Sequence, residues 1–143
     1  MKKLPPITRR PIEIDRVLAS VRDDSAGGTV VFLGTVRKRS GGKGVRGLRY
    51  EVYREMAVKK MGEIEAAVRR KWPVIGITMV HRYGSLKVGE VSVAVAVSCE
   101  HRAEAFEACK YAIDAIKGII PLWKKEKFQG GNESWVKGSP VGE

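Results

Sequence analysis

Two long segments with helical periodicity, each ended by a proline, most constrain what this chain can fold into. Along residues 55–72, and again along residues 103–120, apolar side chains recur at intervals of three or four positions. That spacing places them on one face of an α-helix. Pro73 and Pro121 follow directly, and proline disfavours helical geometry in the residue before it. We therefore predict two amphipathic helices, whose buried stripes consist of Ala57, Met61, Ile64 and Val68 in the first and Phe106, Cys109, Ile113, Ile116 and Ile120 in the second.

The segments around these helices have the character of strands, because apolar and β-branched residues dominate them and glycine or proline turns separate them. The predicted strands cover residues 29–36, 48–53, 74–80, 91–97, 122–128 and 134–136. We expect the first to be central in its sheet and the second to complete a hairpin after it. Two long helices against an antiparallel or mixed sheet make an α+β fold, and the length favours a single domain over residues 1–143.

The charge balance limits the possible partners without selecting a fold. The chain has 27 Lys and Arg residues against 16 Asp and Glu residues, a formal net charge of +11. Nucleic acid, a phosphorylated small molecule and an acidic protein are therefore the partner classes to consider. Hydrophobic residues make up 43% of the chain, enough to fill a core, which excludes a disordered low-complexity protein.

Several sequence features indicate the compartment. No apolar run approaches the roughly 18 residues of a membrane-spanning helix, and the basic N-terminus lacks the apolar core of a signal peptide. Cys99 and Cys109 match neither a CxxC motif nor a secreted disulfide framework. The two histidines have no HExxH spacing. We therefore predict a cytoplasmic protein with reduced thiols, no membrane contact, no metal and no resident cofactor.

A cationic loop is expected between the first two predicted strands. Its basic residues, with no acid among them, are Arg37, Lys38, Arg39, Lys43 and Arg46. Interleaved glycines favour a mobile loop that could meet a phosphate, although they match neither a Walker loop nor a GxGxxG motif. The competing functional class, a nucleic-acid-binding module, would need aromatic residues interleaved with the basic ones for stacking. Aromatic residues make up only 7% of the chain, which disfavours that class.

Lys117 and Lys124 are the main candidates for chemistry. Lys117 lies at the margin of the second helix's apolar stripe, and Lys124 lies in the following strand on the same face as Glu126. On either side of Pro121, the two lysines can converge on one pocket. Burial and a neighbouring ammonium group both lower the pKa of a lysine, which can then transfer protons or stabilise an anionic intermediate. From spacing alone an alternative stays open, in which Lys117 interacts with the negative end of its helix and Lys124 is solvated.

The dipeptide His-Arg occurs twice, at residues 81–82 and 101–102, each time after an apolar strand. An arginine at a strand end can bind a carboxylate or a phosphate with two N–H groups, and a histidine can move protons near neutral pH. An arrangement in which both dipeptides simply face water is equally compatible with the sequence.

Short motifs spread over most of the chain resemble, in order, those of the large catalytic subunit of molybdopterin synthase. The motifs are FLGTVR at 32–37, YEVY at 50–53 with MA at 56–57, HRYG at 81–84, GE at 89–90, HR and AF within 101–106, Asp114, Lys117, PLWKKE at 121–126 and Trp135. Each motif is weak alone, and their number and order make the resemblance specific. It favours function over the solvated alternatives for the two lysines and for His101 and Arg102.

The resemblance implies a sulfurtransferase with an α/β-hammerhead fold, a type of α+β architecture. Such an enzyme converts cyclic pyranopterin monophosphate into molybdopterin by installing a dithiolene. The sulfur arrives as a thiocarboxylate on the C-terminal Gly-Gly of a small ubiquitin-like partner subunit, whose tail enters the catalytic subunit. The family forms a central homodimer with one small subunit at each end, a heterotetramer. A non-catalytic scaffold is the remaining alternative, and the presence of both lysines argues against it.

The resemblance also implies roles for individual residues. Lys117 would lie beside the thiocarboxylate and assist sulfur transfer, whereas Lys124 would act near the pterin in proton transfer or charge stabilisation. The other matched positions, with part of the pocket supplied across the dimer, would bind the pterin and its phosphate: Arg37, His101, Arg102, Lys125 and Glu126. Within this group Glu126 would orient Lys124.

Overall fold

The computed structural model describes residues 3–131 and 133–137. In chain order its elements are β1 (Ile7–Thr8), α1 (Ile14–Val21), β2 (Gly28–Thr35), β3 (Arg39–Ser40), β4 (Lys43–Val52), α2 (Arg54–Lys71), β5 (Val74–Arg82), β6 (Gly84–Lys87), β7 (Val91–Cys99), α3 (Arg102–Ile119), β8 (Leu122–Phe128) and β9 (Glu133–Lys137). The predicted α+β class is confirmed. None of the helices in these ranges is both long and apolar enough to cross a membrane.

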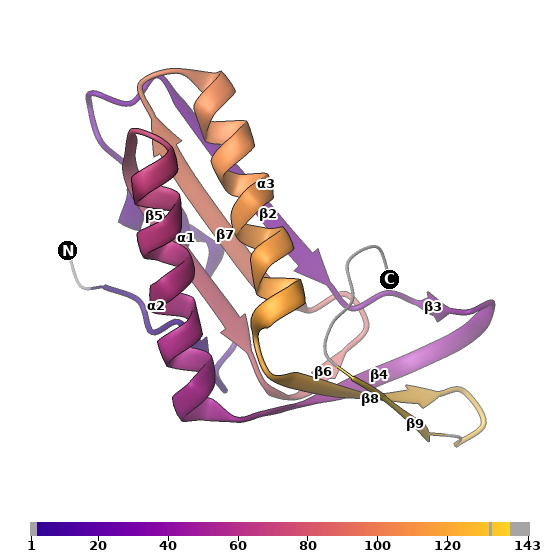
Figure 1. Ribbon diagram of the computed structural model, residues 1–143. Helices are drawn as coiled ribbons and strands as arrows, with labels where there is room; N and C mark the ends of the chain where they lie inside the picture. The colour runs from indigo at the N-terminus through magenta and orange to yellow at the C-terminus, as the bar shows by residue number, and fades with distance from the viewer. Residues whose placement is uncertain (1–2, 132, 138–143) are drawn as a thin grey trace.

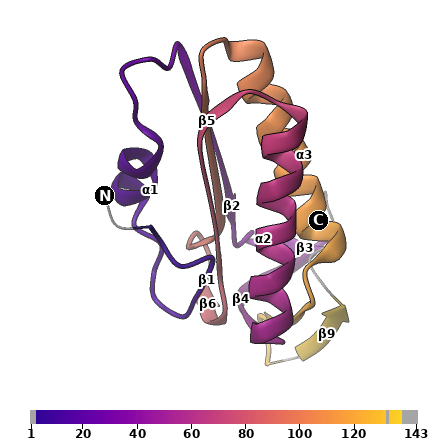
Figure 2. The same ribbon diagram turned by 60° about the vertical axis from the view of Figure 1, so that its left-hand side comes forward.

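A four-stranded sheet forms the centre of the molecule, with strand order β1-β5-β7-β2. β1 pairs with β5 in parallel, and the other pairs are antiparallel. The long helices α2 and α3 lie side by side on one face of this sheet, and α1 covers the other face (Figures 1 and 2). β7 is therefore covered on both faces, which explains why its residues are apolar without alternation and buried from Ser92 to Cys99.

A second sheet extends from the end of α3 (Figure 1). In this sheet β4 pairs with three strands, β3, β6 and β8, and β9 pairs with β8. The predicted alternation along β8 is confirmed: Leu122, Lys124 and Glu126 are buried, whereas Trp123 is exposed. This sheet thus presents a row of charged side chains toward the interior of the protein.

The helical predictions hold for α2 and need one correction in α3. The four predicted stripe residues of α2 are all buried. In α3 the buried side chains are Ala105, Ala108, Cys109, Ala112, Ile113 and Ile116. The prediction for Phe106 is wrong, since its side chain is 61% exposed. The small alanines, rather than the bulky phenylalanine, form the contact face, and they let α3 approach the sheet and α2 closely.

Two strand predictions are also wrong. β2 lies at an edge of its sheet rather than in the centre, and it pairs with β7 rather than with β4. The expected loop 37–47 instead contains a small β3–β4 hairpin, whose turn residues Gly41 and Gly42 have φ angles of 58° and 81°. Glycine adopts such positive φ angles without steric cost. An apolar pattern identifies a strand but does not specify its partner, so the pairing of β2 with β7 does not follow from the sequence.

Candidate active site

A cavity of about 400 Å³ lies between the end of β2, the C-terminal half of α3 and the inner face of the second sheet. Its walls are partly apolar, with Phe32, Leu48 and Ile113 among them. Its charged lining residues are Arg37, Arg39, Asp114, Lys117, Lys124 and Glu126. Four cations against two carboxylates give the cavity an excess of positive charge, which favours an anionic ligand.

Lys124 and Glu126 enter the cavity from β8. Their side chains are on the same face because residues two apart in a strand point the same way, and each is only 6% exposed. Tyr50 and Leu48 on β4 lie opposite Lys124 and Glu126, respectively. The strand spacing places the Cα atoms of Lys124 and Glu126 about 7 Å apart, and their opposite charges on one face reduce the cost of burying each other.

Lys117 reaches the same cavity from the last turn of α3. It is half-buried, and Asp114, one turn earlier, forms an ion pair with Lys110 at 2.7 Å (Nζ to Oδ2). The helix ends at Ile119, and Pro121 starts the turn into β8. The chain therefore brings Lys117 and Lys124 to one cavity from two consecutive elements, the arrangement expected from the sequence.

One arginine from the β2–β3 connection and one from β3 complete the cavity. Arg37 lies at its rim with an exposed side chain. Arg39 also lines the cavity, although the sequence indicates it only as one of the basic residues of the loop. The sequence shows several basic residues close together in this segment, but their spacing alone does not predict which of them line the cavity.

Three predicted site residues lie outside this cavity. His101 immediately precedes α3, and Arg102 is its first residue; both are exposed. Arg102 is fifteen positions before Lys117, which is about 22 Å along a helix. Lys125 lies next to Lys124 but on the opposite face of β8.

His81 is buried, whereas the sequence alone leaves open whether it is functional or faces water. Its side chain is 1% exposed, and its Nδ1–H donates a hydrogen bond of 2.8 Å to the carbonyl oxygen of Arg82. The pKa of His81 is lowered from 6.5 to about 4, mainly by burial and to a lesser degree by the charge of Lys117, while the hydrogen bond to the Arg82 carbonyl opposes the shift. The ring of Tyr50 packs against it edge to face, with centroids 5.0 Å apart. The solvent-facing alternative for this histidine is therefore wrong.

The two cysteines of the chain are both free and buried. Burial raises the pKa of Cys109 to about 11 and raises the pKa of Cys99 as well. A thiol with such a pKa carries almost no thiolate at neutral pH and is a poor nucleophile. Neither cysteine lines the cavity described above.

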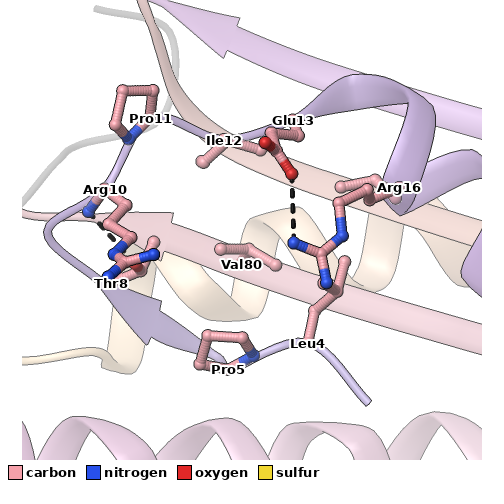
Figure 3. A pocket seen from close by; sticks show the side chains of 10 residues that line it. Leu4, Pro5, Thr8, Arg10, Pro11, Ile12, Glu13, Arg16 and Val80 are labelled. Carbon is pink, nitrogen blue, oxygen red and sulfur yellow. Dashed lines mark hydrogen bonds and ion pairs between the residues drawn. The ribbon is translucent and has the colours of Figure 1, made fainter. Parts of the chain in front are cut away.

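A second cavity, of about 260 Å³, lies beside α1 on the other face of the main sheet (Figure 3). Arg16 and Glu13 form an ion pair at its edge, with 3.1 Å between Nη1 and Oε2. Leu4, Pro5 and Val80 give it apolar walls. It contains none of the predicted site residues. Over residues 3–131 and 133–137, no three or more His, Cys, Asp or Glu side chains are grouped to hold a metal ion.

Comparison with known proteins identifies similar sequences and a similar solved structure. The model of the MoaE protein family matches residues 7–119. A molybdopterin synthase catalytic subunit from Nostoc sp. is 43% identical over 131 residues, 91% of this chain and 79% of that protein. One from Halalkalibacterium halodurans is 42% identical over 130 residues, 91% of this chain and 83% of that protein. The crystal structure of molybdopterin synthase from Staphylococcus aureus superimposes with a TM-score of 0.87 and 37% identity, covering 95% of this chain and 98% of that chain.

Proposed function

Since the chain belongs to the MoaE protein family, we propose that it is the catalytic subunit of a molybdopterin synthase. It transfers two sulfur atoms, one from the C-terminal thiocarboxylate of each of two molecules of a small ubiquitin-like partner, to cyclic pyranopterin monophosphate and so forms the dithiolene of molybdopterin. The observation that carries this proposal is the meeting of Lys117 and Lys124 in one cationic cavity.

The cavity suits two anionic reactants. A thiocarboxylate and a phosphate repel each other in water, and the cations of the cavity lower the cost of bringing them together. In this proposal Lys117, on α3, stabilises the thiocarboxylate during attack of the sulfur and release of the acyl group. Lys124, buried beside Glu126, acts near the pterin, where a fixed ammonium group can donate a proton or stabilise a developing anion. Glu126 orients Lys124 through its charge.

His101 and Arg102 have a place in this proposal through a second copy of the chain. Both are exposed at the start of α3, about 22 Å along the helix from Lys117, so they do not serve the cavity of their own chain. In a homodimer each copy would lend these two residues to the cavity of the other, where they bind the phosphate of the pterin. With one small subunit at each cavity, the assembly is a heterotetramer.

The free, buried cysteines favour a reducing compartment, and we place the reaction in the cytoplasm. Lys125, on the outer face of β8, would contact the partner or the pterin from the edge of the site. No cofactor is needed, because the sulfur comes from the partner and its activation occurs on another enzyme.

The competing nucleic-acid-binding function finds no support in the arrangement of aromatic side chains. Among residues 3–131, the exposed aromatic residues are Phe32, Tyr53, Phe106 and Trp123. They lie on β2, before α2, on α3 and on β8, respectively. Such scattered rings make no continuous platform on which bases could stack.

The proposal is tested by mixing the protein with a thiocarboxylated small subunit and the cyclic pterin, followed by mass spectrometry of the products. We expect the dithiolene product together with a partner whose C-terminus has become a carboxylate. A parallel reaction with the carboxylate form of the partner should give no product. Absence of dithiolene product from the thiocarboxylate form, with binding of random oligonucleotides at physiological salt, would instead support the nucleic-acid function.

A further inference from the structure

His81 occupies a position that core packing alone does not require. On β5 its side chain is on the same face as Met79 and Ile77, which belong to the apolar core under α2 and α3. A polar ring buried in such surroundings costs free energy unless its polar atoms have partners. His81 ends this row of core side chains on β5, close to the cationic cavity. We therefore expect its imidazole to have a specific role.

The contacts of His81 fix both its place and its tautomer. A carbonyl oxygen can only accept, so the bond to the Arg82 carbonyl oxygen puts the proton on Nδ1. In the uncharged ring Nε2 is then an acceptor. Arg82 is itself held, since its Nε donates to the carbonyl oxygen of Arg9 at 3.2 Å and its Nη1 to Glu90 at 3.1 Å. The imidazole is thus anchored on a rigid strand end.

The groups that face His81 connect it to both lysines of the cavity. From β4, Tyr50 presents its ring to the imidazole at an interplanar angle of 79°, and Tyr50 is the cross-strand neighbour of Lys124. From α3, Lys117 acts on the imidazole through its charge. The neighbours of His81 in the main sheet, Ile7 on β1 and Val93 on β7, carry no charge. Lys117 is accordingly the charged group to which the ring responds.

We propose that His81 is a positioning residue for sulfur transfer, whose uncharged imidazole supports the Tyr50 ring behind Lys124 and fixes the place of the Lys117 ammonium group. The proposal rests on the proposed function and deepens it. An apolar ring at this position would offer Lys117 no acceptor. A cationic side chain would repel both lysines. Burial supports the uncharged form at neutral pH, because it disfavours the imidazolium.

The first test compares His81→Phe and His81→Gln with Met79→Ala, a matched control on the same face of the same strand. We expect His81→Phe to slow formation of the dithiolene product, measured with an excess of thiocarboxylated partner, by about 10- to 100-fold, as expected for a displaced catalytic group, with little change in the Kd of the partner. His81→Gln, which can donate to the Arg82 carbonyl and still accept, should recover much of the rate. Met79→Ala should lower stability and leave the rate of the folded enzyme unchanged. Equal rates for His81→Phe and Met79→Ala would overturn the proposal.

The second test does not depend on turnover. Nitrogen-15 NMR of the imidazole should show a proton on Nδ1 and none on Nε2 at neutral pH. In Lys117→Met the pKa of His81 should rise, because the nearby positive charge is gone. An unchanged His81 titration in Lys117→Met would break the proposed link. If the wild-type enzyme made no dithiolene product, the proposed function would fail, whereas this titration would still decide whether His81 and Lys117 are coupled.

Discussion

At the scale of single residues, three acidic or basic side chains in the described part of the chain are buried where water cannot stabilise their charges: His81, Lys124 and Glu126. His81 avoids the cost of burial by staying uncharged. Lys124 and Glu126 have opposite charges on the same face of β8, so each lies in the field of the other. The sequence could predict the second arrangement because alternation in a strand is regular. It could not predict the burial of His81, because the neighbours that exclude water from it come from distant parts of the chain.

The buried histidine should make the stability of the protein depend on pH. The pKa of His81 is about 4 in the folded protein, against 6.5 for an unperturbed histidine. The unfolded chain therefore binds a proton as the pH falls below 6.5, while the folded protein does not until about pH 4. Between pH 7 and pH 5, His81 should remove about 2 kcal/mol from the free energy of unfolding.

Urea unfolding of the wild type and of His81→Gln at pH 7 and pH 5 measures this contribution. The difference in unfolding free energy between the two proteins should shift by about 2 kcal/mol in favour of the variant at the lower pH. His101→Gln, which alters an exposed histidine, should retain the wild-type loss. A His81→Gln protein that loses as much stability as the wild type would contradict the assignment.

At the scale of elements, the long helices were predictable and the short strands were not. α2 and α3 begin and end within one residue of the predicted ranges, because a 3.6-residue period and a following proline are strong local signals. β1 and β6, with two and four residues, are too short to show any period. The error at Phe106 has another cause: both Phe106 and Ala105 fit a helical stripe, and only the packing of α3 against the main sheet and α2 decides which face is buried.

The close approach of α3 through its alanines predicts sensitivity to added volume. Ala112 is fully buried, so Ala112→Leu should overpack the core and lower the free energy of unfolding by about 1–3 kcal/mol. Ala103→Leu, at an exposed position of the same helix, should change it by no more than about 0.5 kcal/mol. Chemical denaturation of the two variants is the measurement. Similar losses for both would mean that α3 does not pack as described.

At the scale of the whole molecule, the two ends of α3 have different tasks in our proposal. The C-terminal end contributes Lys117 to the cavity of its own chain. The N-terminal end presents His101 and Arg102 outward, for the cavity of a second copy. The sequence motifs indicated that all three residues belong to one kind of site. They could not indicate which copy supplies each residue, because that depends on the symmetry of an assembly.

If each cavity receives residues from two copies of the chain, two different inactive variants should restore activity when they form a dimer together. Lys117→Ala and Arg102→Ala should each have little activity alone. When the two chains are refolded together, half of the dimers should contain one copy of each, and one of the two cavities in such a dimer has both residues. The mixture should therefore recover about one quarter of the wild-type rate. No recovery, with mixed dimers demonstrated by native mass spectrometry, would place Arg102 outside the partner's cavity.

The most direct measurement of the central claim is the rate at which Lys117→Ala and Lys124→Ala form the dithiolene product with an excess of thiocarboxylated partner, with binding of the small subunit measured in parallel. Lys127→Ala is the matched control, because Lys127 belongs to the same strand but does not line the cavity. We predict that each cavity variant binds the partner normally and forms product at least about 100-fold more slowly, whereas Lys127→Ala retains the wild-type rate. Near-normal product formation by Lys117→Ala would contradict the account.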